Sequence, residues 1–183
     1  MLSQAIALAP NAARARLDLA QLQFNGGEAA QALRTLLDAL KAAPGAVALM
    51  AQPLRQYAQA CGTPALALEP LKAAYASFPA LDVLDAIVAM ERSSAATQDT
   101  ARDWYVRHLQ NHPSLVAAAQ WIEGEKLEHE QFHPQVQRAL DHAVKPLKRY
   151  RCAACGFEAQ QHFWHCPGCQ AWDSYPPRRV EEL

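Results

Sequence analysis

Four cysteines near the end of the chain are the residues best suited to chemistry. They form two Cys-x-x-Cys pairs, Cys152 with Cys155 and Cys166 with Cys169, and ten residues separate the pairs. Each pair offers two sulfurs from one tight turn, and two such turns facing each other supply the four thiolates of a tetrahedral metal site. Four protein ligands leave no open coordination position, so the spacing predicts a closed, structural site.

The sequence predicts one tetrahedral metal ion and leaves open whether it is iron or zinc. Both metals accept four thiolates with similar geometry. Two disulfides would use the same sulfurs, but no secretory leader opens the chain, and nothing else marks a secreted protein. The fifth cysteine, Cys61, lies among small and apolar residues and is expected to be a buried thiol. A reducing compartment fits all five cysteines.

Aromatic side chains crowd the cysteine segment. About thirty residues cannot bury enough surface to fold alone, so a metal ion and a small aromatic core are both expected to hold this module together. We expect the module to span residues 148–177 and residues 178–183 to be a tail. The aromatic residues expected to form its core and a docking face are Tyr150, Phe157, Phe163, Trp164 and Trp172.

The rest of the chain has the composition of a helical protein. Of its 183 residues, 51% are apolar; alanine is very frequent and β-branched residues are few, which favours an all-α body. The net charge is −1, so no overall field draws the protein to nucleic acid or anionic lipid. No apolar run reaches the roughly 18 residues of a membrane span.

A sequence period of 34 or 35 residues is marked by Pro10, Pro44, Pro79 and Pro113. Small and large residues recur at fixed distances before these prolines. This pattern favours antiparallel helix pairs that approach closely at the small residues, with the proline ending each second helix. The residues that coincide in this register are Ala32, Ala67 and Ala101, followed by Leu36, Leu71 and Tyr105.

The pattern resembles the tetratricopeptide repeat from about residue 11 to 113. Ser114 is a good N-cap for a further helix to about Glu130, and a helix from about Pro134 to Val144 would complete a degenerate fourth pair. The repeats are therefore expected over 11–147. Residues 1–10 are interpreted as the tail of a truncated preceding repeat, so the chain is expected to begin inside a longer array, as a piece of a larger protein or as a truncated reading frame.

A repeat solenoid binds other molecules along a curved surface and carries no chemistry of its own. The groove-facing positions are mixed and mostly uncharged. We expect them to bind a protein partner; the alternative is that they form only a solvated face. The candidate partner-binding residues are Leu17, Gln21, Phe24, Gln52, Gln56 and Gln59.

One apparent zinc-protease motif falls in the fourth helix pair. His129-Glu130-Gln131-Phe132-His133 matches H-E-x-x-H, which on a helix places two imidazoles on one face. Pro134 follows at once and biases His133 away from helical geometry. We interpret the match as coincidence.

The segments Tyr150-Arg-Cys-x-x-Cys-Gly-Phe157 and Trp164-His-Cys-Pro-x-Cys-x-Ala-Trp172, placed directly after such repeats, resemble the C-terminal part of the lipopolysaccharide assembly protein B family. The resemblance implies a non-enzymatic regulator on the cytoplasmic side of the bacterial inner membrane. It implies that the protein acts with the membrane protease FtsH to promote degradation of the LpxC deacetylase of lipid A synthesis. The family's N-terminal membrane anchor and early repeats lie outside this chain, which alone is expected to be soluble and cytoplasmic.

Two other functions remain open. A nucleic-acid-binding zinc ribbon would use the basic run Lys145, Lys148, Arg149 and Arg151, with Tyr150 and Trp164 for stacking, although a slightly acidic chain argues against it. A rubredoxin-like electron carrier is suggested by the knuckles, which resemble those of rubredoxin. The gap between the pairs is shorter than in rubredoxins, and Gln170 stands where glycine is usual.

Overall fold

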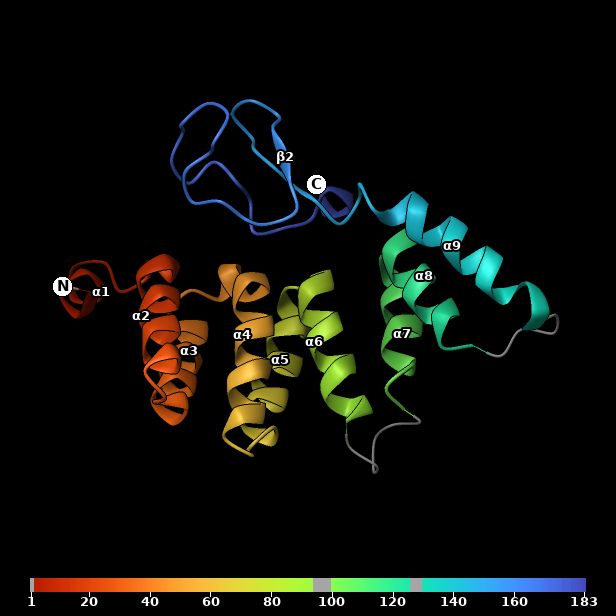
Figure 1. Cartoon of the computed structure of the whole chain (residues 1–183). Helices are drawn as coiled ribbons and strands as arrows, with labels where there is room; N and C mark the ends of the chain where they lie inside the picture. Colours follow the sequence, from red (N-terminus) through yellow and green to blue (C-terminus); the bar gives the residue numbers. More distant parts are fainter. Residues whose placement is uncertain (1, 94–99, 126–129) are drawn as a thin grey trace. The chain divides into compact units, whose positions relative to one another are not determined.

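The computed structural model describes residues 2–93, 100–125 and 130–183 (Figure 1). The chain divides into two compact units, Met1–Ser94 and Ala95–Leu183. The division falls between the two helices of the third predicted pair.

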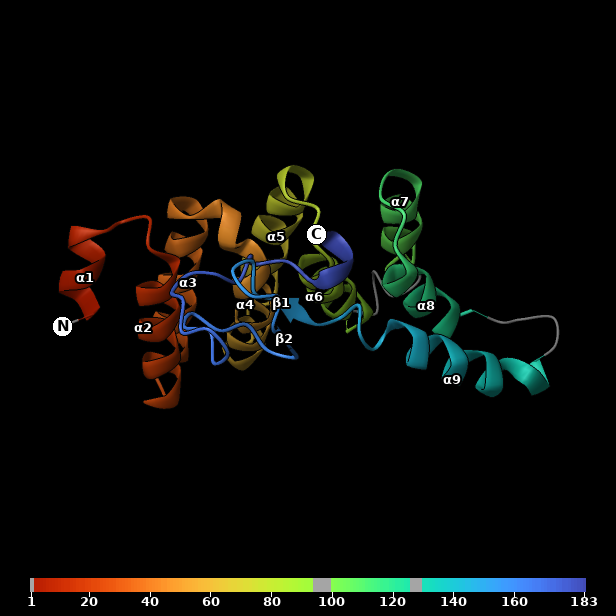
Figure 2. The same cartoon turned by 90° about the horizontal axis from the view of Figure 1, so that it is seen from above.

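The first unit consists of helices that follow the predicted pairs (Figures 1 and 2). Helix α4 packs against α3, α5 and α6, and α2 packs against α3. The elements are α1 (Leu2–Leu8), α2 (Ala13–Asn25), α3 (Ala29–Ala42), the 3-10 turn η1 (Pro44–Ala46), α4 (Val47–Ala60), α5 (Ala65–Ser77) and α6 (Leu81–Arg92).

The predicted repeat is confirmed by where its marker residues lie. Each of the four periodic prolines stands two residues after the last residue of a helix. Ala32, Ala67 and Ala101 are all 0% exposed, as close approach of paired helices requires. The larger residues one turn later, among them Leu36 and Leu71, are equally buried and fill the layer between the helices. The all-α tetratricopeptide-repeat architecture predicted from the sequence is therefore confirmed.

The first helix of each of the first two pairs ends in the same way. Gly27 and Gly62 adopt the left-handed conformation, with φ of 84° and 68°. The N–H of the residue after each glycine reaches back to the carbonyl five residues earlier, at 2.8 and 2.9 Å. These are Schellman closures, in which glycine avoids the steric cost that a Cβ would meet at positive φ. The turn into each second helix is thus set by a glycine.

The second unit begins with three helices. They are α7 (Asp103–Asn111), α8 (Leu115–Glu123) and α9 (His133–Val144), with the 3-10 turn η2 (Glu130–Phe132) before α9. Ser114 caps α8 as expected, because its Oγ accepts a hydrogen bond of 2.9 Å from the N–H of Ala117. The helix ends at Glu123, earlier than the expected end near residue 130, and Gly124 is its C-cap. Arg102, before α7, forms an ion pair with Glu125, after α8.

The cysteine module follows α9 and contains little regular structure. A two-stranded antiparallel ladder pairs β1 (Tyr150–Arg151) with β2 (Glu158–Ala159), in the register Tyr150 to Ala159 and Arg151 to Glu158. His165 and Trp172 form a further antiparallel bridge. The expected tail at 178–183 instead forms the 3-10 turn η3 (Val180–Glu182).

The turn η3 is bound to the rest of the second unit. The N–H of Val180 donates to the carbonyl of Arg149 at 2.7 Å. The Glu181 carboxylate accepts from the Ser114 hydroxyl at 2.7 Å and from the N–H of Val116 at 3.2 Å, so it caps the start of α8. The chain end thereby ties the metal module to a repeat helix within the same unit.

Across residues 2–93, 100–125 and 130–183, the helices are too short or too polar for any of them to cross a membrane.

Candidate metal centre

The four cysteines meet at one point, with all four Sγ atoms within 4.8 Å of one another. The Sγ atoms of Cys152 and Cys169 are 3.8 Å apart, and those of Cys155 and Cys166 are 3.7 Å apart. A tetrahedron with metal–sulfur bonds of about 2.3 Å has sulfur–sulfur edges of about 3.8 Å. The residues present therefore fit one tetrahedrally coordinated ion.

The two Cys-x-x-Cys turns are built by the same backbone bonds. The N–H of Cys152 donates to the carbonyl of Phe157, and the N–H of Gly156 donates back to the carbonyl of Cys152, both at 2.9 Å. In the second turn, Cys166 donates to Ala171 and Gln170 donates back to Cys166, again at 2.9 Å. Each turn therefore presents its two sulfurs to the same side.

The residue after the second cysteine of each pair must take a left-handed conformation. Gly156 does so with φ of 77°, and Gln170 does so with φ of 61°. Glycine bears this conformation without steric cost, whereas a residue with a Cβ is strained by roughly 1–2 kcal/mol. The departure from glycine noted in the sequence thus leaves the turn intact.

Backbone N–H groups point at the sulfurs and favour their ionised form. A hydrogen bond from the Ser174 hydroxyl, then the N–H groups of Cys155 and Ala154, lower the pKa of Cys152 to about 6, although burial opposes the shift. Burial likewise opposes ionisation of Cys166, but the N–H groups of Cys169 and Gly168 outweigh it, so that its pKa is also lowered. One cysteine of each pair is therefore prepared to be a thiolate.

The neighbouring thiols oppose ionisation of the Cys155 sulfur. The N–H of Phe157 lowers the pKa of Cys155, but hydrogen bonding with Cys169 and desolvation raise it to about 12. Four thiols this close cannot all ionise unless a cation lies among them, because like charges in one site oppose each other. The donor set therefore suits a divalent or trivalent metal ion and explains why binding would release protons.

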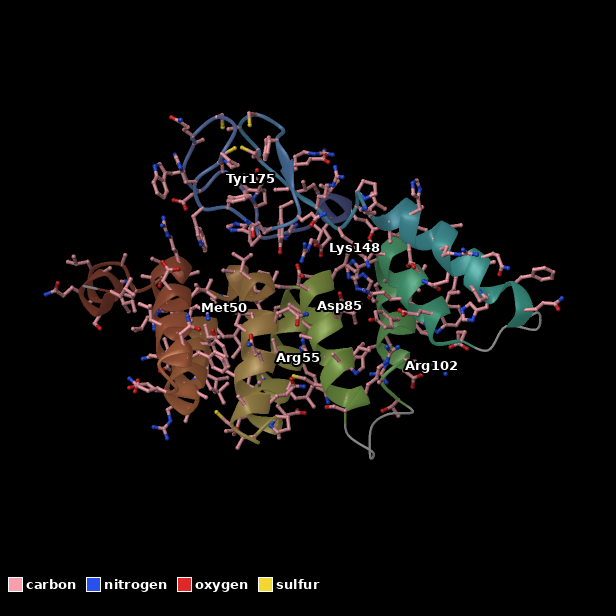
Figure 3. The ribbon with its side chains drawn as sticks, in the orientation of Figure 1. Met50, Arg55, Asp85, Arg102, Lys148 and Tyr175 are labelled. Atoms are coloured by element: carbon pink, nitrogen blue, oxygen red, sulfur yellow. The ribbon has the colours of Figure 1, made fainter. Side chains whose placement is uncertain are left out.

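Two residues that support the sulfurs were missed from the sequence. Ser174 Oγ lies 3.2 Å from Cys152 Sγ and 3.2 Å from the carbonyl of Ala171. Its single proton can serve only one of them, and an ionised Cys152 is the stronger acceptor. Tyr175 is 3% exposed; its hydroxyl donates to the carbonyl of Phe157 at 3.1 Å and lies 4.0 Å from Cys166 Sγ (Figure 3). Neither residue stands in a metal-binding spacing, so no sequence signal marked them.

The aromatic residues of the module divide into a core and a surface. Tyr150 is buried and meets the edge of the His162 ring, and His162 Nε2 lies 3.0 Å from the carbonyl of Tyr175. Phe157 and Trp172, by contrast, are 44% and 59% exposed. The predicted aromatic core therefore consists mainly of Tyr150 and the unforeseen Tyr175.

The stacking surface needed by a nucleic-acid-binding ribbon is partly occupied. The guanidinium carbon of Arg179 lies 4.2 Å from the centre of the Tyr150 ring, and Tyr150 is 5% exposed. A buried ring covered by an arginine cannot stack on a base. Trp164 is half-buried against His162, with ring centres 4.7 Å apart.

The candidate partner-binding residues lie on the first helices of two successive repeats. Leu17, Gln21 and Phe24 are on α2, and Gln52, Gln56 and Gln59 are on α4. Two members of the α2 set, Gln21 and Phe24, contact Tyr57 of α4, which is not among the predicted residues. Phe24 stacks on the Tyr57 ring at 4.3 Å, and the Tyr57 hydroxyl donates to Gln21 Oε1 at 3.2 Å.

These contacts distinguish structural members of the set from accessible ones. Phe24 is half-buried and stacks on Tyr57, and Gln21 accepts a hydrogen bond from Tyr57, so these two residues connect α2 to α4. Leu17 is half-buried. The three α4 glutamines are exposed. Gln52 Oε1 accepts from Arg55 at 3.0 Å. Gln56 and Gln59 are exposed and, within the described residues, their side chains form no hydrogen bond.

The apparent zinc-protease motif receives no support from the described residues. His129 lies outside them. His133 is the first residue of α9, and its Nε2 is buried without a hydrogen-bond partner among the described residues.

The fold and the site together define a helical-repeat protein that carries a C-terminal four-cysteine metal-binding module. Comparison with known families agrees at both ends of the chain. The tetratricopeptide repeat family model matches residues 1–52, and the model of the rubredoxin metal-binding domain matches residues 150–177.

Curated relatives carry the similarity across the whole chain. Lipopolysaccharide assembly protein B of Escherichia coli strain K12 is 27% identical over 188 aligned residues, covering 98% of this chain and 47% of that protein. The protein of the same name from Haemophilus influenzae is 30% identical over 47 residues, or 26% of this chain and 12% of its own. The resemblance to the lipopolysaccharide assembly protein B family is thus confirmed. The chain spans about half the length of the E. coli relative.

Proposed function

We propose that this protein is a non-enzymatic adaptor in the regulation of lipopolysaccharide assembly, binding protein partners through its repeats and using its metal module structurally. The observation that carries the proposal is the similarity to lipopolysaccharide assembly protein B over 98% of the chain. It covers both the repeats and the module.

The chemistry of the site supports a structural role for the module. Four thiolates complete the coordination of an iron or zinc ion, so neither water nor substrate has a position on it. When bound, the ion would supply cross-linking of the two cysteine turns. Ser174 and the backbone N–H groups form hydrogen bonds with the Cys152 sulfur, and Glu181 connects the module to α8 through its hydrogen bond with Ser114.

The finer part of the proposal follows from the resemblance. The repeats would bring the membrane protease FtsH together with the LpxC deacetylase and so promote LpxC turnover at the cytoplasmic side of the inner membrane. Among the residues considered, exposed Gln56 and Gln59 on α4 are best placed to touch a partner.

Capture of the tagged protein from its own bacterium, followed by detection of FtsH and LpxC, tests this proposal. We expect both proteins to be captured and LpxC to accumulate when the gene is deleted. The double variant Gln56→Lys with Gln59→Lys should weaken capture. Gln110→Lys, the same type of substitution at an exposed position of α7, should not. Absence of both proteins together with an unchanged LpxC level would refute the adaptor role.

A further inference from the structure

A basic pocket lies where α9 leads into the metal module. The cavity has a volume of about 360 Å³ and lies entirely within the second unit. Four of its lining residues are cations, Lys145, Lys148, Arg149 and Arg179, while Asp141 is its one acid; Val144 and Gln160 complete the lining. We propose that this pocket binds the phosphate group of a small phosphomonoester.

Two of the four cations are available for a ligand. Lys145 and Lys148 are exposed and, within the described residues, form no hydrogen bond or ion pair through their ammonium groups. Lys148 follows the end of α9 (Figure 3). An ammonium group offers three donors on a flexible stem and binds phosphate as a point charge. These two side chains therefore supply mobile positive charge at the mouth of the pocket.

The two arginines are held in place by the module. Arg179 Nη1 donates to the carbonyl of Lys148 at 2.7 Å, and its guanidinium lies on the Tyr150 ring. Arg149 Nη1 is 3.5 Å from Glu158, but Glu158 is bound more closely by Arg151, at 2.8 Å. The charge of Glu158 is thus balanced mainly by Arg151. Arg149 keeps donors for an oxyanion, and an arginine fork matches phosphate geometry.

The negative groups near the pocket do not cancel these charges. Asp141 accepts a hydrogen bond of 3.0 Å from Gln137 Nε2, which engages part of its acceptor capacity. The C-terminal end of α9 also points carbonyls this way, and a helix C-terminus disfavours anions. The carbonyl of Val144 is already bound by the N–H groups of Leu147 and Lys148, at 3.0 and 3.2 Å. Among the lining residues four are cations and one is a carboxylate. Glu158 lies beside Arg149, and the Glu182 carboxylate accepts from the N–H of Arg179 at 2.8 Å, so the positive excess rests mainly on Lys145 and Lys148.

Size and charge together select the ligand class. Pockets for small molecules span about 300–1,000 Å³, so this cavity accommodates a phosphate with a small polar group attached. A phosphomonoester carries between one and two negative charges at neutral pH, which the positive excess can balance. Gln160 offers both a donor and an acceptor to the attached group. The phosphate comes either from a free metabolite or from a lipid headgroup, and the experiment distinguishes the two.

Binding is tested on the purified, metal-loaded protein, without any partner, so the outcome is independent of the adaptor proposal. Glycerol phosphate and inorganic phosphate are titrated by calorimetry, with glycerol as the uncharged control. The amide resonances of Arg149 and Gln160 are followed by NMR. Co-sedimentation with phosphatidylcholine vesicles, with and without phosphatidic acid, tests the lipid source.

The expected result is saturable binding of glycerol phosphate or of phosphatidic acid vesicles, with a shift of both amides in the soluble arm. Lys148→Gln and Lys145→Gln should each weaken binding about tenfold, the usual effect of one charged hydrogen bond. Lys41→Gln removes the same charge from an exposed side chain of α3 and should change nothing. Binding in neither arm, or equal weakening by all three substitutions, would overturn the proposal.

Discussion

Removal of the Glu181 carboxylate should loosen the second unit measurably. Its Oε2 accepts from the Ser114 hydroxyl at 2.7 Å, and its Oε1 accepts from the N–H groups of Leu115 and Val116, at 2.5 and 3.2 Å. The first N–H groups of a helix have no partner within the helix, and a negative charge there also favours the helix dipole. The Glu181 side chain therefore both accepts hydrogen bonds from the first N–H groups of α8 and places a negative charge at the start of this helix.

The magnitude follows from those contacts. Loss of an N-cap interaction costs about 1 kcal/mol, and loss of a charge at a partly buried helix start costs about 1 kcal/mol more. Glu181→Ala should thus lower the free energy of unfolding of the second unit by about 2 kcal/mol. Glu181→Gln keeps one acceptor oxygen but loses the charge, so it should cost about 1 kcal/mol.

Urea unfolding, together with hydrogen exchange at the amides of Val116 and Ala117, measures the effect. The exchange of α8 amides should accelerate, while amides in α3 and α4 should keep their protection, because repeats contact only their neighbours. Glu123→Gln is the matched control, since it removes the same charge from an exposed position of α8 without breaking a side-chain hydrogen bond or ion pair within the described residues. Equal stability of Glu181→Ala and Glu123→Gln would refute the reasoning.

Two further predictions concern the cysteine turns and pH. Gly156→Ala should weaken metal binding by about 1 kcal/mol, because φ is 77° there, whereas Gln170→Gly should be neutral or slightly stabilising. Competition with a chelator measures the metal affinity of both variants. An unchanged affinity in Gly156→Ala would contradict the argument. Burial, then the neighbouring His112, lower the pKa of His108, so folding disfavours protonation of this imidazole. The unfolded chain binds that proton more readily, so stability should be fully present above pH 6.5, the usual pKa, and fall as the pH drops towards the folded pKa. His108→Gln should flatten this acid dependence of the urea midpoint and exposed His142→Gln should not; the reverse would show that another group causes it.

Much of the fold could be predicted because its signals are local. The proline period and the alanines Ala32, Ala67 and Ala101 report close helix pairing directly, since only small residues fit where two helices touch. The clustering of the four cysteines could be predicted equally well, because a tetrahedral site needs two sulfurs from each tight turn. The end of α8 was not, because residues that favour helix, among them Glu125, Lys126 and Leu127, continue in the sequence past Gly124, where the helix stops.

The parts of the site that escaped prediction depend on contacts distant in sequence. Glu181 and Ser114 are 67 residues apart, and no local sequence pattern links the side-chain carboxylate of Glu181 to the N-cap Ser114. Tyr175 stands nine residues after Cys166 and enters the core only because the chain folds back beneath the sulfurs. The basic run was visible from the sequence, but its partner Arg179 and the pocket between them were not.

Native mass spectrometry of the protein and of its Cys166→Ser variant tests the central claim most directly, because it separates a bound ion from two disulfides by mass. We predict one iron or zinc ion per chain in the parent protein and none in the variant. Structural metal sites in small modules contribute on the order of 10 kcal/mol to folding, so residues 149–177 of the module should unfold in the variant. Circular dichroism should show that most helix is retained. A parent chain without metal that has lost four hydrogens to two disulfides would contradict the account, as would a Cys166→Ser variant with a protease-resistant C-terminus.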